Sequence, residues 1–162
     1  ALKTVPAEPD VRWAMLKVLI SKLDLRQFRL PSKRVQLAET AAAAYRPSYA
    51  RQELKALIAA SGEEVARVCA KLSGQEALLE KILQSGECVS LRGLAVNGRD
   101  FPALHGKAAG DMLRKLLDYV LLHPEKNNRQ TLLRLAEEWS GNSDADGHKD
   151  VGDVKCQQKD TL

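Results

Sequence analysis

The chain has 162 residues, 25 Lys and Arg against 21 Asp and Glu, a formal net charge of +4, and only 4% aromatic residues. This length suffices for one domain, or for two small regions sharing a core, without stabilising disulfides or metal ions. Ten Gly and six Pro exclude a collagen-like or low-complexity chain, and no apolar run approaches the roughly 18 residues of a membrane span. Three widely spaced Cys (Cys69, Cys88 and Cys156) favour a reduced cytoplasmic setting over a disulfide framework.

Residues 1–139 predict an all-α fold, a compact array of about seven helices. Ala, Leu, Lys, Arg and Glu dominate this part, and the period-2 alternation typical of strands is missing. Apolar residues recur instead at helical spacing, as in the stripe that follows Pro9. The expected helices begin at Pro9, Ser32, Ser48, a Ser61–Glu64 capping box, after Gly74, after Gly110, and at Asn127 or Asn128.

Two stretches interrupt the helical pattern. Residues 86–110 hold five Gly and Pro102, so we expect an ordered loop in which Asp100 caps a short turn at 101–105. Residues 140–162 have no aromatic and few apolar side chains, which predicts a disordered tail. Because this tail carries five Asp and three Lys, the remaining residues 1–139 hold a net charge of +6.

Little in the sequence is typical of catalysis. Gly-x-Gly-x-x-Gly, P-loop and Gly-x-Ser-x-Gly motifs are absent, and Asp144 and Asp146, the one pair of Asp spaced for two metals, fall in the predicted tail. His105 and His123 are interpreted as ordinary surface residues rather than ligands. The chain alone is therefore expected to hold no metal or cofactor and to catalyse nothing.

A first basic cluster, the corner cluster, places four cations in nine residues around Pro31. Its members are Arg26, Arg29, Lys33 and Arg34. Cations gathered at a corner between helices can contact phosphates and release their counterions. The alternative is a solvated helix face, since Lys and Arg are usually exposed.

A second group, the glycine-turn cluster, lies at the predicted start of a helix. It comprises Lys107, Gly110, Arg114 and Lys115. A Gly-rich turn before a helix exposes backbone N–H groups at the positive end of the helix dipole, where anions bind. The alternative is a tight connection in which Gly serves packing alone.

Trp13 and Trp139 lie on apolar faces and are expected to anchor the core rather than stack on bases.

Several segments of residues 10–139 resemble a known family. Residues 96–110 read VNGRDFPALHGKAAG and continue through 113–122, PEKNNR at 124–129 and LLRLA at 132–136, while RWAML at 12–16 and FRLPSK at 28–33 lie upstream. Together they resemble the C-terminal part of bacterial CCA-adding tRNA nucleotidyltransferases. The chain departs from the family pattern at Phe101, Ala109, Asp111 and Arg114, where the family has Leu, Pro, Pro and Gly.

The resemblance implies a tRNA-binding fragment. In this family an N-terminal head, with a Gly-Ser motif and an Asp-x-Asp pair for Mg²⁺, adds nucleotides from CTP and ATP. The helical body and tail hold the acceptor and T arms of tRNA. Residues 1–85 would be body-like and 86–139 tail-like, with 140–162 as the disordered tail. The head is missing, and Ala1 at the start is consistent with an internal cut. Both basic clusters are then the expected RNA contacts.

Two other classes of function stay open. The chain could be a stand-alone helical adaptor that docks a protein partner on an apolar strip. It could also be a DNA-binding module in which residues 104–110 form the hairpin of a helix–hairpin–helix. A membrane partner is not expected, and the sequence leaves the oligomeric state open.

Overall fold

The structure is a computed structural model and describes residues 6–143. Within that range the protein is all-α, as the sequence predicts, with seven α-helices and no strand. The helices are α1 (Pro9–Leu19), α2 (Ser32–Ala44), α3 (Arg51–Ser61), α4 (Glu63–Ser73), α5 (Glu76–Gln84), α6 (Lys107–Leu122) and α7 (Arg129–Ser143). The 3₁₀ turns are η2 (Leu25–Phe28), η3 (Leu91–Gly93), η4 (Gly98–Asp100) and η5 (Pro124–Lys126). No helix of this range is long and apolar enough to cross a membrane.

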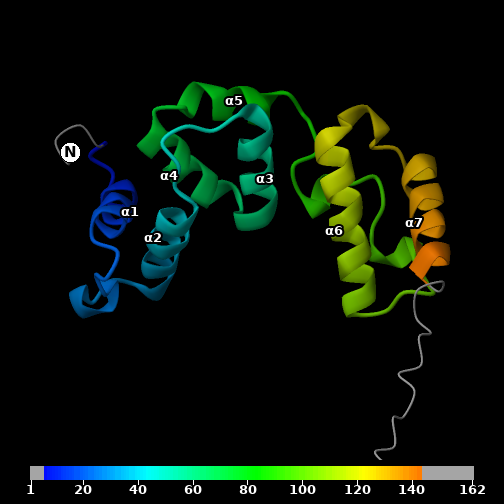
Figure 1. Ribbon diagram of the computed structural model, residues 1–162, viewed down its shortest axis with the longest axis horizontal. Helices are drawn as coiled ribbons and strands as arrows, with labels where there is room; N and C mark the ends of the chain where they lie inside the picture. Colours follow the sequence, from blue (N-terminus) through cyan, green and yellow to red (C-terminus); the bar gives the residue numbers. More distant parts are fainter. Residues whose placement is uncertain (1–5, 144–162) are drawn as a thin grey trace, which may run out of the picture.

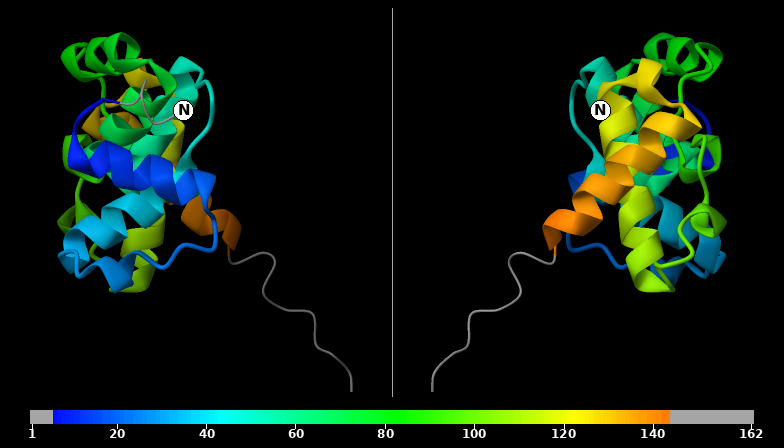
Figure 2. Two further views of the ribbon diagram at one scale, coloured as in Figure 1. Left: turned by 90° about the vertical axis from the view of Figure 1, so that its left-hand side faces the viewer. Right: turned by 90° about the vertical axis from the view of Figure 1, so that its right-hand side faces the viewer.

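The helices are arranged as an arch (Figure 1). Helices α1 to α5 form the longer arm, with α1 and α2 at its free end, and α6 and α7 form the shorter arm. Viewed along its length the molecule has a much narrower outline, in which the helices of the two arms overlap (Figure 2). The arch therefore has a convex side, which carries α5 and η5, and an open side between the arms.

Buried apolar side chains of the described residues form two clusters. The first is built from α1 to α5 and includes the fully buried Leu54 and Ile82. The second is built from α6, α7 and the preceding loop and includes the fully buried Leu116 and Leu132. Burying a Leu or Ile side chain stabilises the fold by about 1.5–3 kcal/mol. Each cluster therefore holds its own arm together.

Both tryptophans pack against these clusters, as the sequence predicts. Trp13 packs against the first cluster and Trp139 against the second. Trp139 also meets Tyr119 edge to face, with ring centroids 6.1 Å apart. The division of the chain into a body-like region, residues 1–85, and a tail-like region, residues 86–139, stays a prediction.

The two clusters meet where α3 contacts α6. Lys55 of α3 is 4% exposed, pairs with Glu87 and donates to the Leu121 carbonyl at 3.4 Å. Gln52 donates to the same carbonyl at 2.7 Å, and Arg51 contacts Glu87 at 2.5 Å. A buried ammonium needs such partners because desolvation of an unpaired charge is strongly unfavourable. This group of charged and polar contacts, the joint, connects the arms.

Several predicted helix ends agree with the structure. Pro9 stands in the first turn of α1, and Gly74 ends α4 in the left-handed conformation at φ 69°. The carboxamide of Asn128 accepts the Thr131 N–H at 2.9 Å and so caps α7. Residues 144–162 of the predicted disordered tail lie outside the described residues. Helix α7 runs to Ser143, the last described residue.

Other predicted helix ends are wrong. The Ser61–Glu64 capping box does not form, because α3 runs to Ser61 and Gly62, at φ 86°, joins α3 to α4. A residue with a Cβ rarely adopts that φ, so glycine rather than serine occupies the position between the two helices. Helix α3 begins at Arg51 instead of Ser48, where the Glu53 carboxylate accepts the Ala50 N–H at 2.7 Å.

Candidate nucleic-acid interface

The corner cluster spans η2, the residues after it and the first turn of α2, which holds Lys33 and Arg34. The Asp24 carboxylate accepts the Arg26 N–H at 3.0 Å and opens the turn. The turn ends at Arg29, whose N–H donates to the Arg26 carbonyl at 3.1 Å. Arg29 has φ 52° and ψ 33°, the left-handed conformation. Pro31 then precedes α2 as its N-cap residue, so Ser32 begins the helix without capping it.

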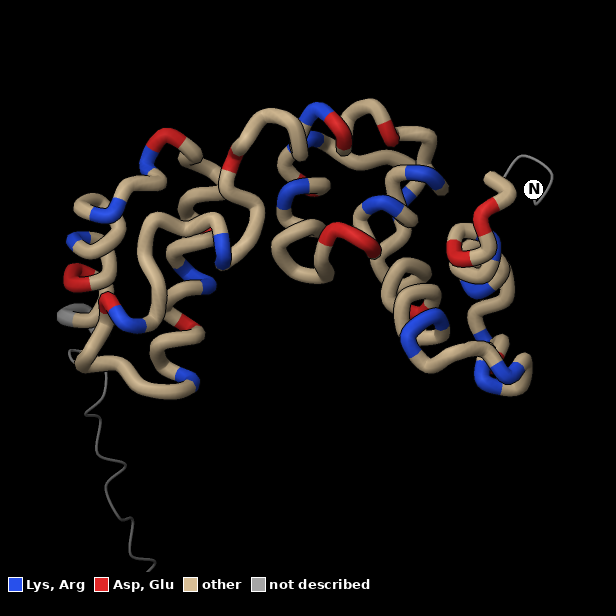
Figure 3. Tube along the Cα trace, turned by 180° about the vertical axis from the view of Figure 1, so that it is seen from behind, with Lys and Arg blue, Asp and Glu red and all other residues tan. Residues whose placement is uncertain are grey.

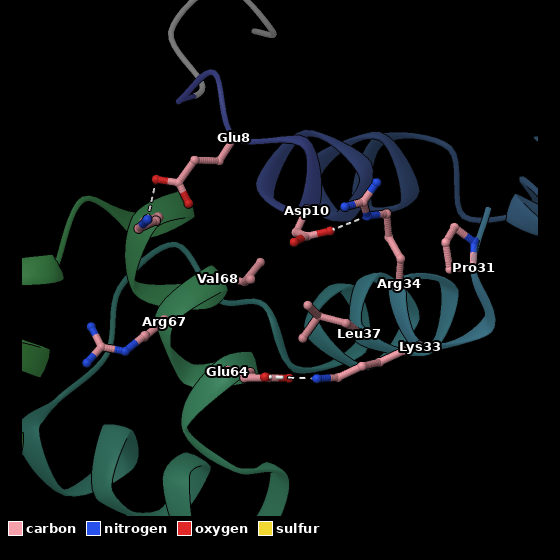
Figure 4. A pocket seen from close by; sticks show the side chains of 10 residues that line it. Glu8, Asp10, Pro31, Lys33, Arg34, Leu37, Glu64, Arg67 and Val68 are labelled. Atoms are coloured by element: carbon pink, nitrogen blue, oxygen red, sulfur yellow. Dashed lines mark hydrogen bonds and ion pairs between the residues drawn. The ribbon is translucent and has the colours of Figure 1, made fainter.

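The four corner cations have different partners. Arg26 and Arg29 are exposed and form no ion pair with a described residue. Arg34 donates to Asp10 of α1 at 2.7 Å, and Lys33 contacts Glu64 of α4 at 3.1 Å (Figure 4). Arg26 and Arg29 are therefore uncommitted, and Arg34 connects α2 to α1. Lys33, whose side chain is 81% exposed, can exchange Glu64 for another anion.

The glycine-turn cluster lies at the beginning of α6. The helix starts at Lys107, with Gly106 at φ 54° as its N-cap residue, and not after Gly110 as predicted. The Gly110 N–H donates to the Gly106 carbonyl at 3.2 Å, so it is a helical hydrogen bond and not a free donor. The expected turn after Asp100 forms, since the Leu104 N–H donates to the Phe101 carbonyl at 2.9 Å, but Asp100 does not cap it. Its carboxylate instead accepts the Asn97 N–H at 2.8 Å and pairs with Arg129.

The cations of this second cluster are exposed. Lys107 and Lys115 form no ion pair with a described residue. Arg114 lies 3.5 Å from Asp111, with 73% of its side chain exposed. Such an exposed pair contributes about 0–1 kcal/mol and exchanges partners readily. Lys107, Lys115 and, through exchange, Arg114 are thus free to contact an anion.

The two clusters lie at the two ends of the arch on its open side. The connection holding Arg26 and Arg29 is at the end of one arm, and the start of α6 is at the end of the other (Figures 1 and 3). Between them the junction of α3 and α4 carries Glu63 and Glu64, red in the middle of Figure 3. The open side therefore has basic ends and an acidic middle.

A hollow of 390 Å³ between α1, α2 and α4 also holds several charges (Figure 4). Its cations are matched by carboxylates: Lys71 pairs with Glu8, Arg34 with Asp10 and Lys33 with Glu64. Leu37 and Val68 supply apolar lining. Because its charges are already balanced, this hollow is a poor site for a phosphate.

Two features were missed by sequence reasoning. Phe28, between Arg26 and Arg29, has 45% of its surface exposed, and its ring lies against Trp13 with centroids 5.1 Å apart. The second missed feature is the ion pair between the buried Lys55 and Glu87. A signal for Phe28 was present, since it is an aromatic residue inside a run of cations. Lys55 directly follows the buried Leu54, but its partner Glu87 comes after α5 and could not be predicted from the sequence of α3.

Comparisons with known proteins add no relative. No protein-family model matches the chain, and searches of curated proteins and of solved structures found no match. Among the described residues no group of three or more His, Cys, Asp or Glu is placed to hold a metal ion. The fold and the site together define an all-helical protein with uncommitted cations at both ends of an arch.

Proposed function

We propose that this chain is the tRNA-holding body and tail of a CCA-adding tRNA nucleotidyltransferase. In this proposal the chain grips the acceptor and T arms of tRNA in the cytoplasm. Nucleotide addition to the tRNA 3′ end, with Mg²⁺, CTP and ATP, belongs to a catalytic head outside this sequence.

One observation carries the proposal: each end of the arch carries uncommitted cations, and both groups lie on the same side. Arg26 and Arg29 occupy one end, and Lys107 and Lys115 the other. Double-stranded RNA is recognised mainly by its shape and its phosphates. Two separated basic contacts fit a long anionic duplex better than they fit a small ligand. The acidic middle then faces a stretch of the ligand that the protein does not touch.

The eight residues expected to contact RNA do not contribute equally in this proposal. Arg26, Arg29, Lys107 and Lys115 contact phosphates. Lys33 and Arg114 contribute when they exchange their exposed carboxylate partners for a phosphate. Arg34 instead orients α2 through Asp10, and the Gly110 N–H is used within the helix, where it donates to the Gly106 carbonyl.

The test measures tRNA binding against salt concentration for two double variants, Arg26→Ala/Arg29→Ala and Lys107→Ala/Lys115→Ala. Each lost phosphate contact lowers the log–log salt slope by roughly 0.9, so each double variant should lose about two units. A matched control is Lys81→Ala/Lys126→Ala, which removes the same charge from two exposed residues on the convex side. If either site variant behaves like this control, the proposal is wrong.

The alternatives predict other outcomes. A helix–hairpin–helix needs a helix on each side of residues 104–110, whereas a three-residue 3₁₀ turn, η4, precedes them here. Equal affinity for tRNA and duplex DNA would nevertheless support the DNA-binding alternative. A protein-docking adaptor predicts that tRNA does not bind even at low salt.

A further inference from the structure

Phe28 presents an aromatic ring on a rigid support at the end of the arch. Its ring is tilted by 46° to that of Trp13, and Trp13 itself packs against the first apolar cluster. Because 45% of Phe28 is exposed, part of the ring remains open to solvent. A supported and partly exposed ring is the feature on which a nucleobase stacks.

Two uncommitted guanidinium groups flank this ring in the chain. Arg29 is the one non-glycine residue with positive φ among residues 6–143. The left-handed conformation is unfavourable for a residue with a Cβ, and glycine or asparagine adopts it more easily. The sequence nevertheless has an arginine there, at a position whose backbone conformation favours glycine. Such residues gather at binding sites.

The start of α2 adds further groups that fit a nucleotide. The Arg34 and Val35 N–H groups donate to the Pro31 carbonyl, whereas Ser32 and Lys33 begin the helix at the positive end of its dipole. A hollow of 480 Å³ lies alongside, lined by Arg26, Leu30, Ser32, Val35, Gln36 and Glu39. Its hydroxyl, amide and carboxylate can donate to and accept from the edge of a base.

We propose that this corner binds one unstacked nucleotide of single-stranded RNA. The base stacks on Phe28, and its phosphates contact Arg26, Arg29 and the start of α2. Two carboxylates lie nearby: Asp24 accepts the Arg26 N–H at 3.0 Å, and Glu39 lines the hollow, where the edge of a base can donate to it. The inference rests on the proposed function for its RNA ligand and adds that the ligand includes an unpaired base.

The low aromatic content of the chain does not contradict this site. It argues against a groove that stacks many successive bases, but one base needs only one ring. An acidic peptide is the rival occupant, since it would also meet Arg26 and Arg29. It lacks a planar ring to cover Phe28, and this difference separates the two occupants in an experiment.

The test uses Trp13 as a reporter. The chain has two tryptophans, so Trp139→Phe leaves Trp13 as the single source of tryptophan fluorescence. Titration with a single-stranded oligoadenylate should change this fluorescence, while an RNA duplex of equal length should change it much less. Phe28→Leu, which keeps an apolar cover on Trp13, should weaken oligoadenylate binding roughly 5- to 100-fold. Phe28→Tyr should bind within about twofold of the parent, since it retains a ring that stacks.

Equal affinity of Phe28→Leu and Phe28→Tyr for oligoadenylate would overturn the inference, as would an equal fluorescence change with oligoglutamate. These measurements are independent of the tRNA proposal. If the α6 variants leave the tRNA salt slope unchanged while oligoadenylate depends on the Phe28 ring, the tRNA function fails and the nucleotide site stands. If tRNA binding follows the predicted slopes but the Phe28 ring makes no difference, only the nucleotide site fails.

Discussion

Glu87→Gln is expected to destabilise the joint between the two arms. The Glu87 carboxylate accepts from buried Lys55 and, at 2.5 Å, from Arg51. These two hydrogen bonds, the one from Lys55 being the stronger, lower the pKa of Glu87 from 4.5 to about 2. A carboxyl group whose pKa is lower in the folded state stabilises the fold above its unfolded pKa. The stabilisation is lost as the pH falls from about 4.5 to about 2.

The size of the effect follows from this shift. A pKa lowered by about 2.5 corresponds to about 3.4 kcal/mol, at about 1.36 kcal/mol for each unit. Because 20% of the Glu87 side chain is exposed, screening by solvent reduces the expected contribution to about 2 kcal/mol. Glutamine keeps the shape of the side chain and an acceptor oxygen but leaves Lys55 without a counter-charge. The loss at pH 7 should therefore be about 2 kcal/mol.

Urea denaturation at pH 7, 4.5, 3 and 2 measures this effect. The unfolding free energies of the parent and Glu87→Gln should differ by about 2 kcal/mol at pH 7 and converge at pH 2. A suitable control is Glu80→Gln, because Glu80 pairs with Arg67 at 2.5 Å but is 46% exposed. The control should lose about 0–1 kcal/mol. The reasoning is refuted if the two variants behave alike, or if the gap for Glu87→Gln does not shrink as the pH falls.

Two further substitutions test local backbone features. Arg29→Gly should raise the free energy of unfolding by about 1 kcal/mol, because glycine adopts the left-handed conformation at φ 52° without the clash of a Cβ. A lower melting temperature would contradict this expectation. Asn128→Ala removes the acceptor of the Thr131 N–H and should lower the free energy of unfolding by about 1 kcal/mol. Asn128→Asp, which keeps a capping oxygen, should show little loss in the same urea titration.

The helices were predictable because their signals are local. The apolar stripe after Pro9, the glycine after α4 and the asparagine before α7 each act within a few residues of the helix end that they define. The Ser61–Glu64 segment was misread because its serine and glutamate have the spacing of a capping box. In the structure Ser61 is the last residue of α3, and Gly62 precedes α4. The start of α6 was misplaced because Gly110 was taken to end a turn, although a helix tolerates it.

The candidate site was only partly predictable, because its character depends on neighbours from other helices. The sequence placed four cations at one corner, but Asp10 and Glu64, which come from α1 and α4, decide which of them are engaged. The exposed face of Phe28 depends in the same way on how Trp13 of α1 lies beneath it. Residue type can be read from one segment, whereas the partner of a side chain depends on how segments pack.

The joint also bears on the order in which the protein folds during synthesis. The buried members of the first apolar cluster end at Ile82, so the first arm can form while the second is still being translated. Lys55 of this arm, however, has a partner in the second arm. The Leu121 carbonyl that accepts from it lies 66 residues further along the chain. Until α6 is in place, the ammonium group can stay hydrated, and docking of the second arm buries it. Lys55 thus ties the last step of assembly to the arrival of the C-terminal helices.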